Sequence, residues 1–392
     1  MNDTTEDSPI GQIMEIIIEQ GFGGMDQAMT ILINEAMKIE RASALQATAY
    51  ERTPDRQGHA NGYKPKNVKS RLGNLGLQVP QVRGGIEFYP SALEKGERSE
   101  RALKLAMAEM YIKGVTTRKV SGVLQKLCGL DFSSADVSRA SAILDKELNL
   151  WRNRPLGDVV YLMLDARYEK VRMNGSVVSC AVLVATGVRA DGKRSVLGVA
   201  VSMSEAEVHW RDFLLSLKMR GMHGVKLVTS DDHSGLRAAL QSSMAGVPWQ
   251  RCQVHLQRNA TAYVPKTDMR ETVASDIRSI FNAPDREEAD RLLAKTVEKY
   301  SKTAGRLSIW MEENIPDGLA VFAMPEKHRR RLRTTNMVER QNREIKRRTR
   351  VSGLFPNEDS LLRLVSAILM EVSEDWESAD KAYLKMKTDG CA

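Results

Sequence analysis

Between residues 159 and 255 the sequence alternates between strand and helix patterns, and this order constrains the fold more than any other feature. Apolar runs typical of strands lie at 159–164, 177–185, 195–202, 225–229 and 249–255. Amphipathic patterns typical of helices lie at 204–218 and 234–243. The segment MNGS at 173–176 predicts a hairpin turn between the first two strands. Antiparallel strands followed by helix, strand, helix and strand predict an α/β sheet.

This order is typical of a ribonuclease H-type sheet, and two of its strands end in aspartate. Asp165 follows the first apolar run, and Asp231 follows the fourth. Each aspartate alone is also a common turn former at a strand end. If the two strands are neighbours, however, both carboxylates stand at the edge where open α/β sheets bind ligands. They would repel each other there, and a divalent cation would remove that repulsion.

A strongly basic stretch at 327–350 offers a third carboxylate. It carries eleven Lys or Arg and two Glu, a net charge of +9 in a chain of +8. A helix is predicted from about Thr335, with Thr334 or Thr335 as its cap. Five side chains then share one face: Asn336, Glu339, Asn342, Arg343 and Lys346. The stretch is either a solvated helix with an incidental Glu339–Arg343 pair, or a helix whose carboxylate holds a metal ion while its neighbours hold phosphates.

The charge and composition favour nucleic acid as the partner. The sequence pI is about 9.2, and the positive charge is clustered. The arginines of the basic stretch are too dense to be core residues, and we predict that they contact the DNA backbone: Arg329, Arg330, Arg331, Arg333, Arg347 and Arg348, together with Asn342, Arg343 and Lys346. No small-molecule substrate is expected.

Other patterns exclude whole classes of protein. The four cysteines are scattered, so a disulfide framework is not expected. No apolar run approaches about 18 residues, so no membrane span is expected. The acidic, polar N-terminus lacks the pattern of a secretory signal. A cytoplasmic protein associated with nucleic acid is expected.

The N-terminal part contains two regions that precede the sheet. Residues 1–8 are predicted to be a disordered tail, and helical patterns follow at 13–19 and 25–46. Short strands are predicted within 69–82, with four apolar residues on the buried side: Leu72, Leu75, Leu77 and Val79. The lysines and arginines around them are either part of a solvated loop or contacts to the DNA backbone.

Three helical patterns at 101–112, 116–128 and 133–148 suggest a helix-turn-helix. Ser138 and Arg139 lie near the start of the last helix, where such helices meet base edges. The alternative is a plain three-helix bundle. The segment WRNRP at 151–155 is predicted to be a linker.

Helical patterns alone occupy 268–281, 285–301 and 303–314, and a last helix is predicted at 359–372. The chain therefore divides into six parts: a helical region at 1–50, a basic β and loop region at 51–100, a helix-turn-helix domain at 101–152, the first part of the sheet domain at 153–255, an all-α insertion at 256–328, and the second part of the sheet domain at 329–392.

Several residues near the aspartates have more than one interpretation. Cys252 and His255 form half of a zinc site, but no second half is in view, so a buried cysteine with a structural histidine is favoured over a zinc site. His233 either orients a carboxylate, touches phosphate or caps the next helix. Trp249 and Trp310 are expected to pack in the core rather than to stack on an unpaired base.

The chain resembles the Mutator-like bacterial insertion-sequence transposases, a family of DDE transposases with a ribonuclease H-like catalytic domain. The motifs that carry the resemblance are NGY at 61–63, EMYIKGVTTRKV at 109–120, MLDARYEKVR around Asp165, SDDHSGL at 230–236, CQVH at 252–255 and TTNMVERQNREIKRRTR at 334–350. The resemblance implies that Asp165, Asp231 and Glu339 bind two Mg²⁺ ions, for which Mn²⁺ is the expected substitute. It also implies an active-site or DNA-end role for Cys252 and His255. With them we group His233 and Asn336 as supporting residues.

The expected function is that of a transposase. Such a protein binds the inverted-repeat ends of its element and target DNA, hydrolyses phosphodiester bonds and transfers strands. Because two ends must be joined, a homodimer on DNA is expected. The rivals are a nuclease without strand transfer and a DNA-binding regulator without catalysis.

Overall fold

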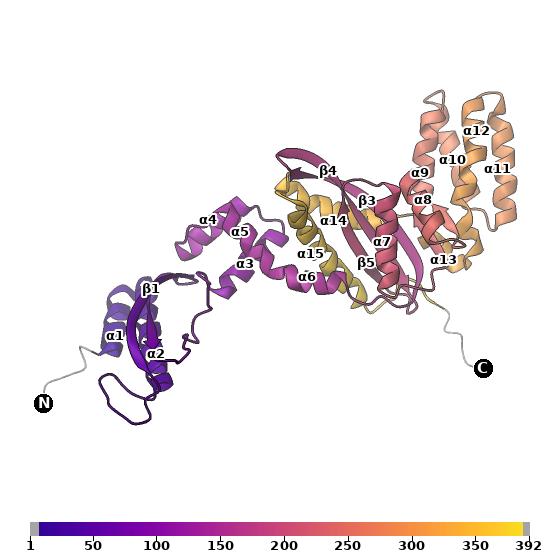
Figure 1. Ribbon diagram of the computed structural model, residues 1–392. Coiled ribbons are helices and arrows are strands. Elements are labelled where there is room, and N and C mark those ends of the chain that lie inside the picture. Colours follow the sequence, from indigo (N-terminus) through magenta and orange to yellow (C-terminus); the bar gives the residue numbers. More distant parts are fainter. Residues whose placement is uncertain (1–7, 387–392) are drawn as a thin grey trace. The chain divides into compact units, whose positions relative to one another are not determined.

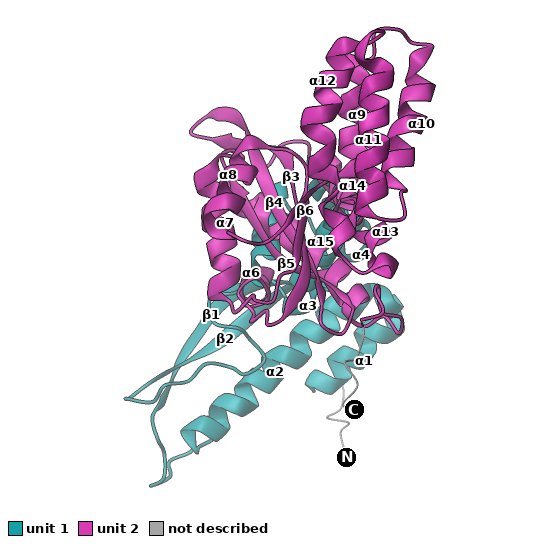
Figure 2. Cartoon of the chain, turned by 90° about the vertical axis from the view of Figure 1, so that its right-hand side faces the viewer, with its two compact units in different colours: residues 1–143 teal, residues 144–392 magenta. Residues whose placement is uncertain are grey.

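The computed structural model describes residues 8–386, and the chain divides into two compact units, residues 1–143 and 144–392 (Figures 1 and 2). The predicted tail at 1–8 lies outside the described residues except for Ser8. The hydroxyl of Ser8 accepts a hydrogen bond from Gly11 N at 3.0 Å and caps the first helix. The finer six-part division of the sequence remains a prediction.

The first unit begins with two helices and a β-hairpin. They are α1 (Pro9–Gln20), a short 3₁₀ turn η1 (Gly21–Gly24), α2 (Met25–Leu45), β1 (His59–Ser70) and β2 (Gly73–Arg83). Met37, Leu75 and Leu77 form their shared core. The strands begin earlier than predicted. Leu72 was expected on the buried side, but it lies in the turn between the strands and is 41% exposed, so that prediction was wrong.

Three further helices complete this unit: α3 (Arg101–Ile112), α4 (Thr117–Cys128) and α5 (Ser134–Ser141). Leu103, Val120 and Val137 take part in their core. Thr116 caps α4, and Ser133 forms a reciprocal capping box with Asp136 on α5.

The single helix predicted at 133–148 is interrupted. A 3₁₀ turn, η2 (Ala142–Leu144), separates α5 from α6 (Asp145–Arg152), which belongs to the second unit. Asp145 there accepts two hydrogen bonds from Arg363, at 2.6 and 2.7 Å. Tertiary contacts therefore override the continuous helical pattern, and part of the predicted linker at 151–155 is helical.

The second unit contains a five-stranded mixed sheet in the order β5-β4-β3-β6-β7. The strands are β3 (Val159–Met173), β4 (Ser176–Arg189), β5 (Arg194–Ser202), β6 (Leu227–Ser230) and β7 (Trp249–Arg251). β3, β4 and β5 pair antiparallel, whereas β6 and β7 add parallel to β3. Asn174 and Gly175 both have positive φ, as a two-residue hairpin turn requires, so the predicted turn at 173–176 is confirmed.

Helices cover both faces of this sheet (Figures 1 and 2). α7 (Glu207–Met219) and α8 (Ser234–Ser243) lie on one face, and α14 (Asn336–Ser352) and α15 (Glu358–Glu377) lie on the other. Trp210 and Leu214 of α7 and Leu236 of α8 pack with the apolar side chains of the strands. α14 therefore meets the sheet from the face opposite to α7 and α8.

A helical block connects β7 to α14. It contains α9 (Gln253–Ala260), η3 (Thr261–Tyr263), α10 (Met269–Phe281), α11 (Arg286–Ser301), α12 (Gly305–Asn314), η4 (Ile315–Gly318), η5 (Ala320–Ala323) and α13 (Glu326–Leu332). The strand predicted at 249–255 was wrong beyond Arg251, because the chain turns at Cys252 and enters α9. Among the described helices, none has the length and apolar character that a membrane crossing requires.

Candidate active site

The sheet register brings Asp165 and Asp231 to the same edge. Met163 of β3 pairs in parallel with Thr229 of β6, and each aspartate lies two residues further along its strand direction. Two residues are one full repeat of a strand, so both aspartates continue the same register. Asp165 is still within β3 and is only 8% exposed. Two carboxylates therefore stand beside each other in a poorly hydrated place.

Burial and mutual repulsion act on both groups. Burial raises the pKa of Asp165 to about 7, and the carboxylates of Asp231 and Glu339 add to that rise. Burial also raises the pKa of Asp231, against the lowering effect of His255 and His233. Both carboxylates therefore accept a proton more readily than an exposed aspartate does.

Helix α14 brings the third carboxylate to these two. Asn342 Nδ2 donates to Asp165 Oδ2 at 2.7 Å, and Arg167 Nη1 donates to Asn342 O at 3.2 Å. One turn earlier on the helix, Glu339 Oε1 lies 3.7 Å from His255 Nε2. The structure thus brings Asp165, Asp231 and Glu339 to one pocket. Asn342 was predicted to contact DNA, but its amide holds a carboxylate of the pocket.

Cys252 and His255 form the wall of the pocket next to Glu339. Cys252 is fully buried, and its Sγ accepts hydrogen bonds from Thr335 N and Thr335 Oγ1, each at 3.4 Å. Thr335 stands at the cap position of α14, yet its hydroxyl serves Cys252, so the prediction that it caps the helix was wrong. Interaction with the Cys252 thiol raises the pKa of His255. Burial would raise the pKa of Cys252, but hydrogen bonds with His255 and Thr335 lower it overall.

The donor atoms of the pocket suit a hard divalent cation. Glu339 Oε1 and Asn342 Oδ1 are buried and have no hydrogen-bond partner within the described part of the chain. Such oxygens, beside two carboxylates of raised pKa, are the ligand type that Mg²⁺ prefers. Cys252, His255 and Glu339 also hold one donor atom each within 4.8 Å of one another. Over residues 8–386 this group has three members, one fewer than a closed zinc site needs.

His233 lies on the other side of Asp231, next to a residue that the sequence reading missed. Its Nδ1 is 3.9 Å from Glu205 Oε2, and it makes no side-chain cap to α8. Glu205 is buried, and burial raises its pKa. The sequence feature that could have pointed to Glu205 is Gly235 in the SDDHSGL motif, because a Cβ at Gly235 would come within 2.2 Å of Glu205 O. Only glycine lets this loop approach α8 so closely.

Comparisons with known proteins identify the family of this chain. The model of the family described as "Transposase, Mutator family" matches residues 2–379. The chain belongs to the Mutator family of transposases. The match extends over both compact units, so it covers the N-terminal helices and hairpin as well as the sheet and the pocket of this Mutator-family chain.

Curated relatives of this Mutator-family protein come from several bacteria. The chain is 54% identical over 381 residues to the transposase for insertion sequence element IS406 of Burkholderia multivorans, covering 97% of this chain and 98% of the relative. It is 40% identical to the transposase for ISRM5 of Rhizobium meliloti, covering 97% and 96%. It is 37% identical to the transposase for IS256 in Tn4001 of Staphylococcus aureus, covering 91% and 92%.

The basic residues of the Mutator-family chain fall into two groups. Arg330 and Arg331 of α13 and Arg343, Lys346 and Arg347 of α14 are exposed and can meet solvent or phosphate. Figure 1 shows α13 and α14 as the helices that lead from the helical block back to the sheet. Asn336, predicted to support the site, is exposed at the start of α14. Ser138 and Arg139 lie on α5 of the first unit, where Arg139 pairs with Asp136.

Three predicted DNA contacts are instead bound within the protein. Arg348 is 7% exposed and lies 2.8 Å from both Glu344 Oε1 and Glu371 Oε2, so the prediction that it contacts DNA was wrong. Arg329 donates to Pro284 O at 2.8 Å and Met324 O at 2.9 Å. Arg333 donates to Asn282 Oδ1 at 2.7 Å. A basic helix on a sheet turns some of its arginines inward, which charge counting does not reveal.

Proposed function

We propose that this protein is a DNA transposase whose pocket cleaves and joins phosphodiester bonds. The observation that carries the proposal is the convergence of Asp165, Asp231 and Glu339, from β3, the end of β6 and α14. The carboxylates of Asp231 and Glu339 raise the pKa of Asp165, which supports a shared site. In this proposal the sheet is a ribonuclease H-like catalytic domain, and the helical block at 256–328 is an insertion within it.

The three carboxylates would hold two Mg²⁺ ions, with Mn²⁺ as a substitute. When bound, such a pair activates the attacking oxygen and stabilises the leaving oxygen of a phosphodiester. The chain's own residues then have separate tasks. Asn342 fixes the orientation of the Asp165 carboxylate, and His255 lies against Glu339. His233 stands next to Asp231, where Glu205 orients it.

DNA would be held by surfaces of both units. The exposed cations Arg330, Arg331, Arg343, Lys346 and Arg347 are suited to phosphates, which position the duplex without reading its sequence. In the first unit α4 and α5 would act as a helix-turn-helix, with Ser138 and Arg139 on the second helix. This unit would recognise the inverted-repeat ends of the element. A homodimer on DNA would bring two ends together.

One assay tests the proposal against its rivals. The protein is incubated with an end-sequence duplex and target DNA, in Mg²⁺ or in EDTA. A transposase gives metal-dependent nicks at the end and joined products. Nicks without joining would indicate a nuclease, and a mobility shift alone would indicate a DNA-binding regulator. Either of those results would overturn the proposal.

A further inference from the structure

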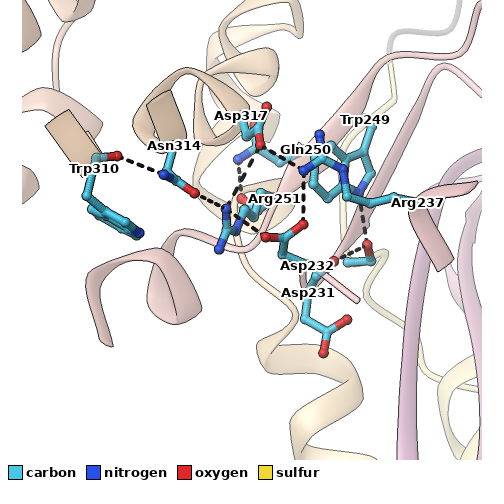
Figure 3. Close-up of polar contacts among 10 residues, drawn as sticks. Asp231, Asp232, Arg237, Trp249, Gln250, Arg251, Trp310, Asn314 and Asp317 are labelled. Atoms are coloured by element: carbon cyan, nitrogen blue, oxygen red, sulfur yellow. Dashed lines mark hydrogen bonds and ion pairs between the residues drawn. The ribbon is translucent and has the colours of Figure 1, made fainter. Parts of the chain in front are cut away.

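Two arginines and two aspartates form a network directly behind Asp231 (Figure 3). Arg251, the last residue of β7, is 3% exposed. Its Nη1 lies 2.9 Å from Asp232 Oδ2 and 4.0 Å from Asp317 Oδ2. Arg237 of α8 lies 3.1 Å from Asp232 Oδ1 and 3.6 Å from Asp317 Oδ2. Each aspartate is therefore shared between both arginines.

The network joins the sheet to the helical block. Arg251 Nη1 also donates to Asn314 Oδ1 at 2.9 Å, at the C-terminal end of α12. Asn314 Nδ2 donates in turn to Trp310 O at 2.9 Å. Beside it, Gln250 Oε1 accepts from Val321 N at 2.7 Å. β7 is thus bound to α12, η4 and η5. A shift of the helical block relative to the sheet would therefore displace Asp232.

Asp231 and Asp232 point to opposite sides of the chain (Figure 3). The residue before them is fixed as well: Ser230 Oγ donates to Asp231 O at 2.8 Å and accepts from Trp249 Nε1 at 2.9 Å. The guanidinium of Arg237 covers the Trp249 ring, 4.6 Å from its centroid. The backbone that carries the Asp231 carboxylate is therefore held from both neighbouring residues.

Stability alone is a poor explanation for this network. A buried ion-pair cluster contributes little to folding compared with well-packed apolar residues of similar size. Groups that orient a metal ligand, by contrast, strongly affect metal binding without contacting the ion. We propose that Arg251 is a positioning residue, which holds Asp232 against the helical block and thereby fixes the carboxylate of Asp231 for a divalent cation. This inference rests on the proposed function, in which Asp231 binds metal.

The sign of two substitutions separates positioning from simple electrostatics. Arg251→Gln removes a positive charge near the pocket, and long-range electrostatics alone would then strengthen cation binding. Asp232→Asn removes a negative charge and would weaken it on either account. Positioning predicts that both substitutions weaken binding, and that the double variant is no weaker than the worse single one, because both act through one contact.

The experiment measures Mn²⁺ binding to the full-length protein by electron paramagnetic resonance, without DNA. We expect Asp232→Asn and Arg251→Gln each to weaken Mn²⁺ binding by about 10-fold. Arg286→Gln is the matched control, because it removes an arginine from the exposed Arg286–Asp290 pair of α11. That variant should bind Mn²⁺ as the wild type does. Melting temperature and binding to an end-sequence duplex are measured in parallel.

Tighter or unchanged Mn²⁺ binding in a folded Arg251→Gln variant would overturn the inference. If that variant does not fold, Mn²⁺ binding is measured for Arg251→Lys instead. Lysine keeps the charge, but its side chain ends one bond short of the position of Arg251 Nη1, the atom that lies 2.9 Å from both Asp232 Oδ2 and Asn314 Oδ1. Positioning therefore still predicts weaker binding. Failure of the proposed function has a different signature: Asp231→Asn would then leave Mn²⁺ binding unchanged, and the inference would fall with it.

Discussion

The pocket and the network behind it use the same residue types in opposite ways. In the network every carboxylate has an arginine partner, Asp232 and Asp317 each facing Arg237 and Arg251. In the pocket, like charges accumulate, and the pKa of Asp165 rises to about 7 because of burial and its carboxylate neighbours. In the network the positive charges of the two arginines therefore balance the negative charges of the two aspartates. Buried groups whose pKa values are shifted by like-charged neighbours are typical of functional sites.

The largest expected effect comes from removing a carboxylate of the pocket. Asp165→Asn, Asp231→Asn or Glu339→Gln should each abolish end cleavage while end-duplex binding is retained, because each removes a metal ligand in the proposed mechanism. A gel assay for nicking and a mobility shift measure the two properties. Cleavage that persists in one variant would remove that residue from the triad.

A loss of stability, rather than a loss of cleavage, is expected for Arg348, which is buried and paired on the same helix as Glu339. Arg348→Gln leaves Glu344 and Glu371 without their shared partner. We expect a loss of about 2 kcal/mol of unfolding free energy, less than for a fully buried pair since both glutamates are partly exposed. Urea unfolding measures it. Arg347→Gln is the comparison: Arg347 also pairs with Glu344, at 2.6 Å, but it is exposed, so its loss should cost less stability. Equal stability of the two variants would contradict the inward role of Arg348.

The pH dependence of stability should reveal the raised pKa of Asp165 in the pocket. The folded pKa of Asp165 is raised to about 7, so between its unfolded pKa and pH 7 the folded state holds one more proton than the unfolded state. Stability of the metal-free protein should therefore fall as pH rises from 5 to 7, by at most about 1.4 kcal/mol per pH unit from this group. Thermal melts in EDTA measure it.

Two controls sharpen that measurement. Asp165→Asn removes the titrating group and should flatten the slope. In the proposed function Mg²⁺ binds the deprotonated pocket, so its stabilising effect should grow as pH rises towards 7. A wild-type slope that is flat in EDTA, or unaffected by Asp165→Asn, would argue against the raised pKa.

The smallest effect is expected at the exposed cations. Arg343→Gln should reduce the salt dependence of end-duplex binding by about one counterion, with little change in stability, because Arg343 faces solvent on α14. Binding isotherms at several salt concentrations give the slope. Arg348→Gln provides the comparison, since a buried arginine should not alter it. A change of slope at Arg348 and none at Arg343 would reverse the assignment.

The sequence predicted the parts of the site that depend on local patterns. Asp165 and Asp231 follow apolar runs, and a parallel pairing of their strands is enough to bring them together. Glu339 is different, because 108 residues separate it from Asp231 and no local pattern fixes where its helix lands. The pattern of the basic helix offered Glu339 as a candidate metal ligand, and the resemblance to a family implied that it joins the two aspartates.

What the sequence could not predict depends on tertiary packing. Arg348 and Arg343 are the same residue type on the same helix, yet Arg348 faces Glu371 on α15 and Arg343 faces solvent. The strand predicted at 249–255 ends at Arg251, so Cys252 precedes a helix and His255 lies on that helix. Glu205 and Arg251 escaped notice because neither belongs to a charge cluster, and their roles arise only from neighbours distant in sequence.

The late position of α14 has a consequence for the making of the protein. A ribosome must complete the sheet and the whole helical block before it adds Glu339. A polypeptide that ends early therefore still carries the first unit and its helices, but it lacks the last acid of the pocket. Such fragments are expected to occupy DNA without cutting it, and so to act as competitors of the finished molecule, which mixing a chain truncated before α14 into the end-cleavage assay would test.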